Sequence, residues 1–166
     1  MVHHGDRAVI IAGSGSDEGH LDDLVNALNK YGVPYDVRIC SAHKQPEDCI
    51  HLMNDLNAEE SRLVVIAVAG GTDALSGMLA WGLYHPVISC PPDGFENRSP
   101  LHNPPGSSNA TIYHPENAAR FVAQCYASDN SDIRTRFRKI KEKKCEGLRA
   151  SDEAMRARYG SPRESA

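Results

Sequence analysis

Short apolar runs alternate with amphipathic segments along most of the chain. The apolar runs end in glycine, serine or proline, which predicts five strands at residues 8–13, 34–40, 62–71, 85–90 and 109–113. Segments with a helical period or with helix start and stop signals lie between and after these runs. They predict helices at residues 18–32, 46–60, 73–83 and 115–127, and a basic helix from residue 133.

Strands that alternate with helices favour a parallel sheet covered on both faces. The fold class predicted is therefore α/β: a three-layer, doubly wound parallel sheet of the flavodoxin or Rossmann type, followed by a C-terminal helix. We expect residues 1–132 to form the α/β domain, and residues 133–166 to form a basic helix and tail that belongs to the same domain or to subunit packing. The loop at 91–108 is long for a compact domain, and such loops are commonly functional.

Composition places the chain among ordinary globular proteins, with 40% hydrophobic and 24% charged residues. No apolar run approaches the roughly 18 residues that a membrane span needs, and the sequence starts without the apolar stretch of a signal peptide. The five cysteines are scattered, odd in number and never spaced as C-x-x-C. We therefore expect a reduced, cytoplasmic protein with neither a disulfide framework nor a zinc site, and no membrane partner.

Charge is divided unevenly along the chain. Residues 1–132 hold seven Lys/Arg against seventeen Asp/Glu, a balance of −10, whereas residues 133–166 hold eleven against five, a balance of +6. An anion site in so acidic a body has to be local. The basic tail suggests nucleic-acid binding, but apolar residues recur in it at helical spacing (Ile133, Phe137, Ile140), which favours a solvated or subunit-packing helix. No nucleic-acid partner is expected.

Polar and glycine-rich segments follow four of the predicted strands. They are "GSGSD" (13–17), "SAHK" (41–44), "AGGTD" (69–73) and "CPPDG" (90–94). In open parallel sheets, ligands bind outside the carboxyl ends of the strands. Four such segments on one edge of the sheet therefore predict a ligand site there.

The first of these segments has the character of an anion-binding loop. Its glycines allow close approach to a ligand, and free N–H groups at the following helix start favour a negative charge. Ser14 and Ser16 add hydroxyl donors. The alternative is that Ser16 or Asp17 only caps the helix. The segment matches neither the dinucleotide fingerprint nor a Walker loop, and it suits a nucleoside monophosphate better.

The second and third segments add a cation, a titratable group and free backbone. Lys44 can hold a phosphate with Ser41 beside it, and His43 has a pKa range suited to proton transfer near neutrality. The alternative for His43 is an ordinary loop histidine. Gly70 and Gly71 allow a flat ring or a carboxylate to approach the strand end closely.

Taken together, five motifs resemble the 5-aminoimidazole ribonucleotide (AIR) carboxylases of purine biosynthesis, the PurE family. They are "GSGSDEGH", "SAHK", "AVAGGTDALSGM", "PVISCPP" and "ENAARFVAQCYA". The resemblance covers roughly residues 8–127. Lysine after the histidine, and the "SDEGH" sequence, point to the class II branch, which uses CO2 directly.

The resemblance implies a reaction and a role for each residue. AIR is carboxylated by CO2 or bicarbonate to 4-carboxy-AIR, without metal or organic cofactor, by a homo-octamer with the terminal helix in subunit packing. Site roles carry over to matching positions: Ser14 and Asp17 for phosphate and ribose, Ser41 and Lys44 for the nucleotide, His43 for the proton at the carboxylated carbon, and Gly70 and Gly71 for the carboxylate or CO2.

Two segments depart from the class II pattern. In "AGGTD", Gly71 and Asp73 stand where that pattern has arginine and asparagine, and "SPLHNPPG" (99–106) replaces a Ser-Ser-Leu-Arg-Met-Pro-type run. An aspartate beside a nascent carboxylate repels it unless the aspartate is capped or protonated, and Asp73 alternatively caps the next helix. Two other functions stay open: the class I reaction, mutation of N5-carboxy-AIR, and a non-catalytic nucleotide- or flavin-binding module of flavodoxin type.

Overall fold

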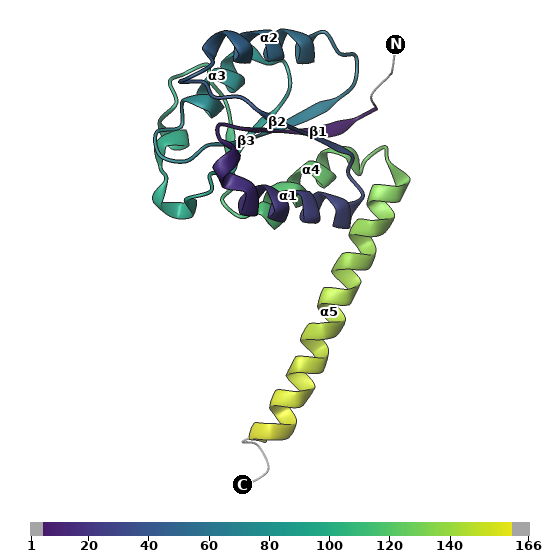
Figure 1. Ribbon diagram of the computed structural model, residues 1–166. Coiled ribbons are helices and arrows are strands. Elements are labelled where there is room, and N and C mark those ends of the chain that lie inside the picture. The colour runs from purple at the N-terminus through teal and green to yellow at the C-terminus, as the bar shows by residue number, and fades with distance from the viewer. Residues whose placement is uncertain (1–4, 161–166) are drawn as a thin grey trace.

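A computed structural model describes residues 5–160 and contains a single five-stranded sheet among them (Figure 1). All strand pairs are parallel, and the strand order is β2-β1-β3-β4-β5. The strands are β1 (Arg7–Ala12), β2 (Tyr35–Ile39), β3 (Leu63–Val68), β4 (Val87–Ser89) and β5 (Ala110–Thr111). The order reverses between β1 and β3, which is where doubly wound sheets bind ligands.

Helices cover both faces of this sheet, so the predicted three-layer α/β fold is confirmed. The helices are α1 (Glu18–Tyr31), α2 (Pro46–Asn57), α3 (Ala74–Gly82), α4 (Pro115–Tyr126) and α5 (Ser131–Tyr159). In Figure 1, α2 and α3 lie on one side of the sheet, and α1 and α4 lie on the other. Proline opens α2 and α4, and Gly32 ends α1 in the left-handed conformation that glycine adopts most readily.

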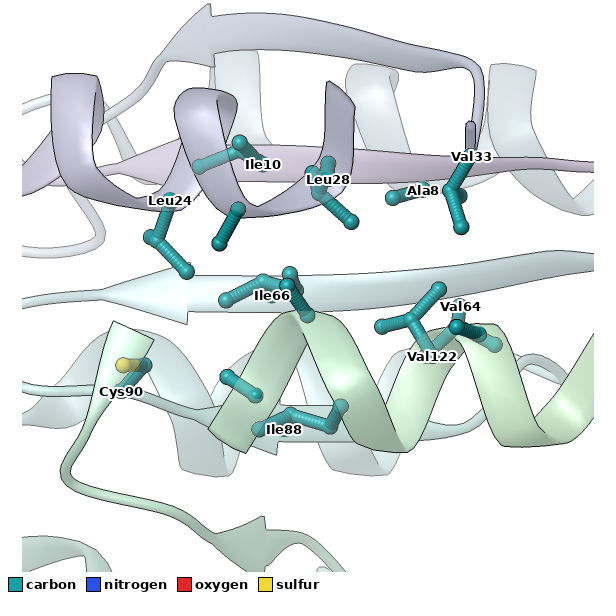
Figure 2. Close-up of a cluster of buried hydrophobic side chains, with 14 of the residues drawn as sticks. Ala8, Ile10, Leu24, Leu28, Val33, Val64, Ile66, Ile88, Cys90 and Val122 are labelled. Atoms are coloured by element: carbon teal, nitrogen blue, oxygen red, sulfur yellow. The ribbon is translucent and has the colours of Figure 1, made fainter. Parts of the chain in front are cut away.

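The first hydrophobic core lies between the sheet and the pair α1 and α4. Alternate residues of β1 and β3, among them Ile10 and Ile66, point to this face and meet Leu24 and Leu28 of α1 and Val122 of α4 (Figure 2). All five side chains are fully buried. Successive side chains of a strand point to opposite faces of the sheet, so every second residue of β1 and β3 lies in this core and the others lie on the opposite face.

The second core lies under α2 and α3. Val9, Ile11 and Val65 point to this face and pack with Leu52 of α2 and Leu79 of α3. Since both faces of β1 and β3 are buried, these strands contain no polar alternation, as the apolar run at 62–71 predicted.

The strand predicted at residues 62–71 extends too far toward the C-terminus, because β3 ends at Val68. Gly71 has φ +64°, which no extended strand can contain, and the chain turns there toward α3. The long loop after β4 is not wholly irregular. It contains two 3-10 turns, η2 (Gly94–Glu96) and η3 (Ser99–His102). Asp93, just before η2, and Ser99, at the start of η3, accept hydrogen bonds from Gly71 and Asp73 in the loop after β3.

The basic helix α5 begins at Ser131, where the Asn130 side chain accepts hydrogen bonds from the first N–H groups of the helix. Its first turns pack on α1 and α4 through Ile133, Phe137 and Ile140. With 29 residues it is about 43 Å long, and its second half extends away from the sheet (Figure 1). Residues 1–4 and 161–166, including the end of the predicted basic tail, lie outside the described residues.

Candidate active site

Three of the four polar segments meet because β1 lies between β2 and β3 in the sheet. Ala12, at the end of β1, is in register with Ile39 of β2 and Val68 of β3. The backbone carries this pairing one residue further. Cys40 N–H donates to the Ala12 carbonyl at 2.8 Å, and Gly13 N–H donates to the Val68 carbonyl at 2.9 Å. The first, second and third loops therefore leave the sheet side by side.

A cavity of about 170 Å³ lies among these loops. Six of the seven predicted site residues line it: Ser14, Asp17, Ser41, His43, Lys44 and Gly70. The rest of the wall consists of Gly13, Ala42, Ala69, Thr72 and the first residues of α3, Ala74 and Leu75. Sequence reasoning named none of these six as site residues, although each lies in or close to one of the first three quoted segments.

The first loop uses its serines to build a short 3-10 turn, η1 (Gly15–Asp17). Ser14 Oγ accepts from the Ser16 N–H at 3.2 Å and lies 2.8 Å from Ser16 Oγ, so Ser14 caps this turn. Asp17 stands at the start of α1 but makes no side-chain hydrogen bond to its first turn. Asp17 is thus the N-cap residue of α1 by position, but its side chain does not cap the helix. The Asp17 carboxylate lines the cavity, where it can accept hydrogen bonds from hydroxyl groups.

The second loop is a tight turn between β2 and α2. Lys44 and Gln45 N–H groups both donate to the Ser41 carbonyl, at 3.2 and 2.7 Å. Because the turn closes on Ser41, the His43 and Lys44 side chains are exposed at the mouth of the cavity. The geometry places a titratable imidazole and an ammonium group next to each other on one wall.

The third loop contributes Gly70 to the cavity but turns Gly71 away from it. The Gly71 N–H donates to Asp93 Oδ2 at 2.8 Å. Asp73 caps α3, since its carboxylate accepts from the Ser76 N–H at 2.8 Å and from the Ser89 hydroxyl at 2.9 Å. Its side chain is buried and does not line the cavity. The capping alternative for Asp73 is confirmed, and its carboxylate is engaged by two hydrogen-bond donors.

The fourth segment reaches the site indirectly. Asp93 and Asn97 of the long loop hydrogen bond the third loop, and sequence reasoning named neither as a site residue. His20 of α1 also contacts this segment, with Nε2 3.0 Å from the Cys90 carbonyl oxygen. The sequence signals that pointed to this region were the "CPPDG" segment, which contains Asp93, and the length of the 91–108 loop.

Two buried cysteines near the site, Cys49 and Cys90, are poor nucleophiles. Burial raises the pKa of the Cys90 thiol to about 12, and burial together with the neighbouring Cys40 raises the pKa of Cys49 to about 12. A thiol with so high a pKa is protonated at neutral pH and cannot attack efficiently. Neither Cys90 nor Cys49 is therefore an effective nucleophile at neutral pH.

Residues 5–160 contain no group of three or more His, Cys, Asp or Glu side chains positioned to hold a metal ion. Over the same range, no helix is both long enough and apolar enough to cross a bilayer.

The side chains around the cavity suit a small anionic ligand that undergoes proton transfer. Ser14, Ser41 and Lys44 can bind a phosphate together, since hydroxyl groups and an ammonium group surround the same space. Asp17 can bind a sugar hydroxyl. His43 can then accept or donate a proton at a ligand atom lying between the loops.

The sheet order and the cavity at its carboxyl edge define an α/β protein of the flavodoxin-like class with a pocket at the switch point of the sheet. The AIR carboxylase family model matches residues 7–146. The chain belongs to the AIR carboxylase (PurE) family.

Individual relatives agree with this assignment. A phosphoribosylaminoimidazole carboxylase of Archaeoglobus fulgidus is 32% identical over 157 residues, which cover 92% of this chain and 86% of that protein. The crystal structure of Treponema denticola PurE superimposes with a TM-score of 0.84 at 28% identity, covering 90% of this chain and 98% of that one.

Longer relatives contain a second activity. The bifunctional phosphoribosylaminoimidazole carboxylase/phosphoribosylaminoimidazole succinocarboxamide synthetase of Rattus norvegicus is 31% identical over 155 residues. The chain spans about a third of the length of such relatives: 36% of the rat protein and 32% of the human one.

Proposed function

We propose that the protein carboxylates AIR with CO2 to form 4-carboxy-AIR in purine biosynthesis. One observation carries this proposal: His43 lies in the same cavity as Ser14, Ser41 and Lys44, the residues expected to hold the nucleotide phosphate. A proton-transfer group beside a phosphate-binding wall is what the reaction needs, because the ring carbon that reacts belongs to the same nucleotide. Family membership supports the same reaction class.

The chemistry requires one positioned base. C4 of AIR is an enamine-like carbon, and its electron pair forms the new bond to the carbon of CO2 while one C=O electron pair moves onto oxygen. C4 then carries both a hydrogen and the new carboxylate. His43 takes that proton, the C–H electron pair restores the aromatic ring, and the imidazolium returns the proton to water.

The alternative within the family is the class I reaction, mutation of N5-carboxy-AIR, which the same site residues could serve. Lys44 after His43 and the "SDEGH" sequence favour the CO2-dependent reaction. We expect 4-carboxy-AIR to form when the protein is incubated with AIR and bicarbonate, with little product from N5-carboxy-AIR under conditions that remove free CO2. Product is measured by chromatography.

The opposite pattern, product from N5-carboxy-AIR alone, would assign the class I reaction. Product from neither substrate would reject catalysis and leave the binding module of flavodoxin type. A flavin-binding version of that module predicts a yellow protein as purified.

We further propose that the protein acts as a cytoplasmic homo-octamer. Large apolar side chains on and after α3 support subunit packing, since Trp81 is 74% and Tyr84 is 88% exposed. Trp81 therefore does not pack between the layers of its own chain. The second half of α5 adds exposed Leu148, Met155 and Tyr159. Light scattering should give the mass of eight chains, and a monomer in dilute buffer would contradict this proposal.

A further inference from the structure

The loop after β4 holds the third loop of the site through a chain of hydrogen bonds. The carboxylate of Asp93 accepts at both oxygens: Oδ2 from the Gly71 N–H at 2.8 Å and Oδ1 from Asn97 Nδ2 at 2.9 Å. Asn97 Oδ1 in turn accepts from the Ser99 N–H at 3.0 Å, and Ser99 Oγ accepts from the Asp73 N–H at 2.9 Å. Both ends of the segment 71–73 are therefore tied to residues 93–99.

Asn97 is the fixed point of this chain. Its side chain is buried, and its Nδ2 also lies 3.4 Å from the Ala69 carbonyl oxygen. Its backbone carbonyl accepts from the Tyr113 hydroxyl at 3.1 Å, which holds the residue in place. A buried amide with this many partners cannot rotate without leaving donors or acceptors unsatisfied. Asn97 Nδ2 must consequently donate to Asp93 Oδ1, and Asp93 Oδ2 accepts from the Gly71 N–H.

Asp93 is close to the wall of the cavity itself. A Cβ atom added at Gly70, which lines the cavity, would lie 3.6 Å from Asp93 Oδ2. Burial alone would raise the pKa of Asp93, but the hydrogen bonds from Gly71 and Asn97 hold it below its usual range. The group is thus a carboxylate at neutral pH, which can accept at both oxygens.

We propose that Asp93 and Asn97 are positioning residues for the carboxylation: they hold the third loop, residues 69–73, in the geometry that receives the carboxyl group. This inference rests on the proposed function. In this proposal the Gly71 N–H donates to Asp93 and does not bind the substrate. The third loop then contacts the carboxyl group through the residues that line the cavity, Ala69, Gly70 and Thr72.

The structure provides a swap that tests the chain of hydrogen bonds. In Asp93→Asn, the single side-chain oxygen can accept from Gly71 or from Asn97, so one donor always faces another donor. Turning the Asn97 amide only moves the conflict to the Ser99 N–H. In Asn97→Asp, two carboxylates face each other. The double variant D93N/N97D restores these three bonds, because the new amide at position 93 accepts from Gly71 and donates to the new carboxylate at position 97, which accepts from the Ser99 N–H. It still loses the contact from Asn97 Nδ2 to the Ala69 carbonyl, so the rescue is partial.

Two readouts are measured on the full-length protein and on all three variants. The first is the exchange rate of the Gly71 amide hydrogen, measured by NMR. It reports on the hydrogen bonds that join residues 93–99 to the third loop, here called the clamp, and needs no substrate. The second is kcat together with the Kd for AIR. Glu96→Gln, a carboxylate-to-amide change at an exposed position of the same loop, is the matched control and should change neither readout.

We expect Asp93→Asn to speed exchange at Gly71 at least tenfold and to lower kcat about tenfold, while the Kd for AIR stays within about threefold. The double variant should be faster in turnover than either single variant and should exchange more slowly at Gly71 than Asp93→Asn, which independent structural damage would not produce. Unchanged exchange at Gly71 in Asp93→Asn, or a double variant worse than both singles, would overturn the clamp. Parent protein that does not carboxylate AIR would instead overturn the proposed function, and exchange at Gly71 would still decide whether the clamp exists.

Discussion

Replacing His43 with asparagine should lower kcat by about 10²–10⁴-fold and leave the Kd for AIR within a few-fold of the parent value. This split follows from the assigned role, since a base that acts on the C4 proton is needed only after the nucleotide is bound. His43 is exposed at the end of a turn that the backbone of Ser41 closes, so its side chain contributes little to folding. Steady-state kinetics and calorimetry measure the two quantities.

The control for this substitution is His51→Asn, at an exposed position of α2 away from the cavity, which should behave as the parent. If His43 only ordered the loop, binding and turnover would fall together. Substantial turnover by folded His43→Asn protein would reject the proton-transfer role. The cavity and its phosphate-binding wall would survive that result.

Lys44→Ala should weaken AIR binding about ten- to hundred-fold, the usual cost of losing one charge-assisted contact to phosphate. The side chain is exposed at the cavity mouth, so its removal leaves both hydrophobic cores intact and the melting temperature nearly unchanged. The body of the protein is acidic, and no general positive field replaces the missing charge.

Calorimetry with AIR measures the effect, and Lys143→Ala, at an exposed lysine of α5, provides the matched control. Equal AIR affinity in the Lys44→Ala protein and the parent would remove Lys44 from the nucleotide site.

The sequence was sufficient to predict the layers of the fold and the edge of the sheet where the site lies. Strands β1 and β3 are buried on both faces, so their composition carries a signal that local reasoning can detect. The loops after parallel strands must leave from one edge, and this constraint alone brings "GSGSD", "SAHK" and "AGGTD" together.

The contacts made by the long loop could not be predicted in the same way. Whether Asp93 accepts from Gly71 depends on how residues 91–108 fold back over β3, and no periodic pattern encodes that path. The sequence predicted that Gly71 binds the carboxylate or CO2. Its N–H is available to a ligand only if no other residue accepts its hydrogen bond, and the fold of the long loop decides whether Asp93 does so. The positions of side chains at the strand ends were predictable, whereas the orientation of single backbone amides was not.

The cavity lined by the first, second and third loops (the three-loop cavity) is proposed to bind AIR with C4 beside His43. A crystal structure of the protein with AIR tests this proposal most directly. We expect the phosphate to contact Ser14, Ser41 and Lys44, and the imidazole ring to lie between the second and third loops with C4 within about 3.5 Å of a His43 ring nitrogen. AIR bound elsewhere, for example in the hollow between α1 and α4 lined by Asn26, Lys30 and His114, with the three-loop cavity empty, would contradict the account.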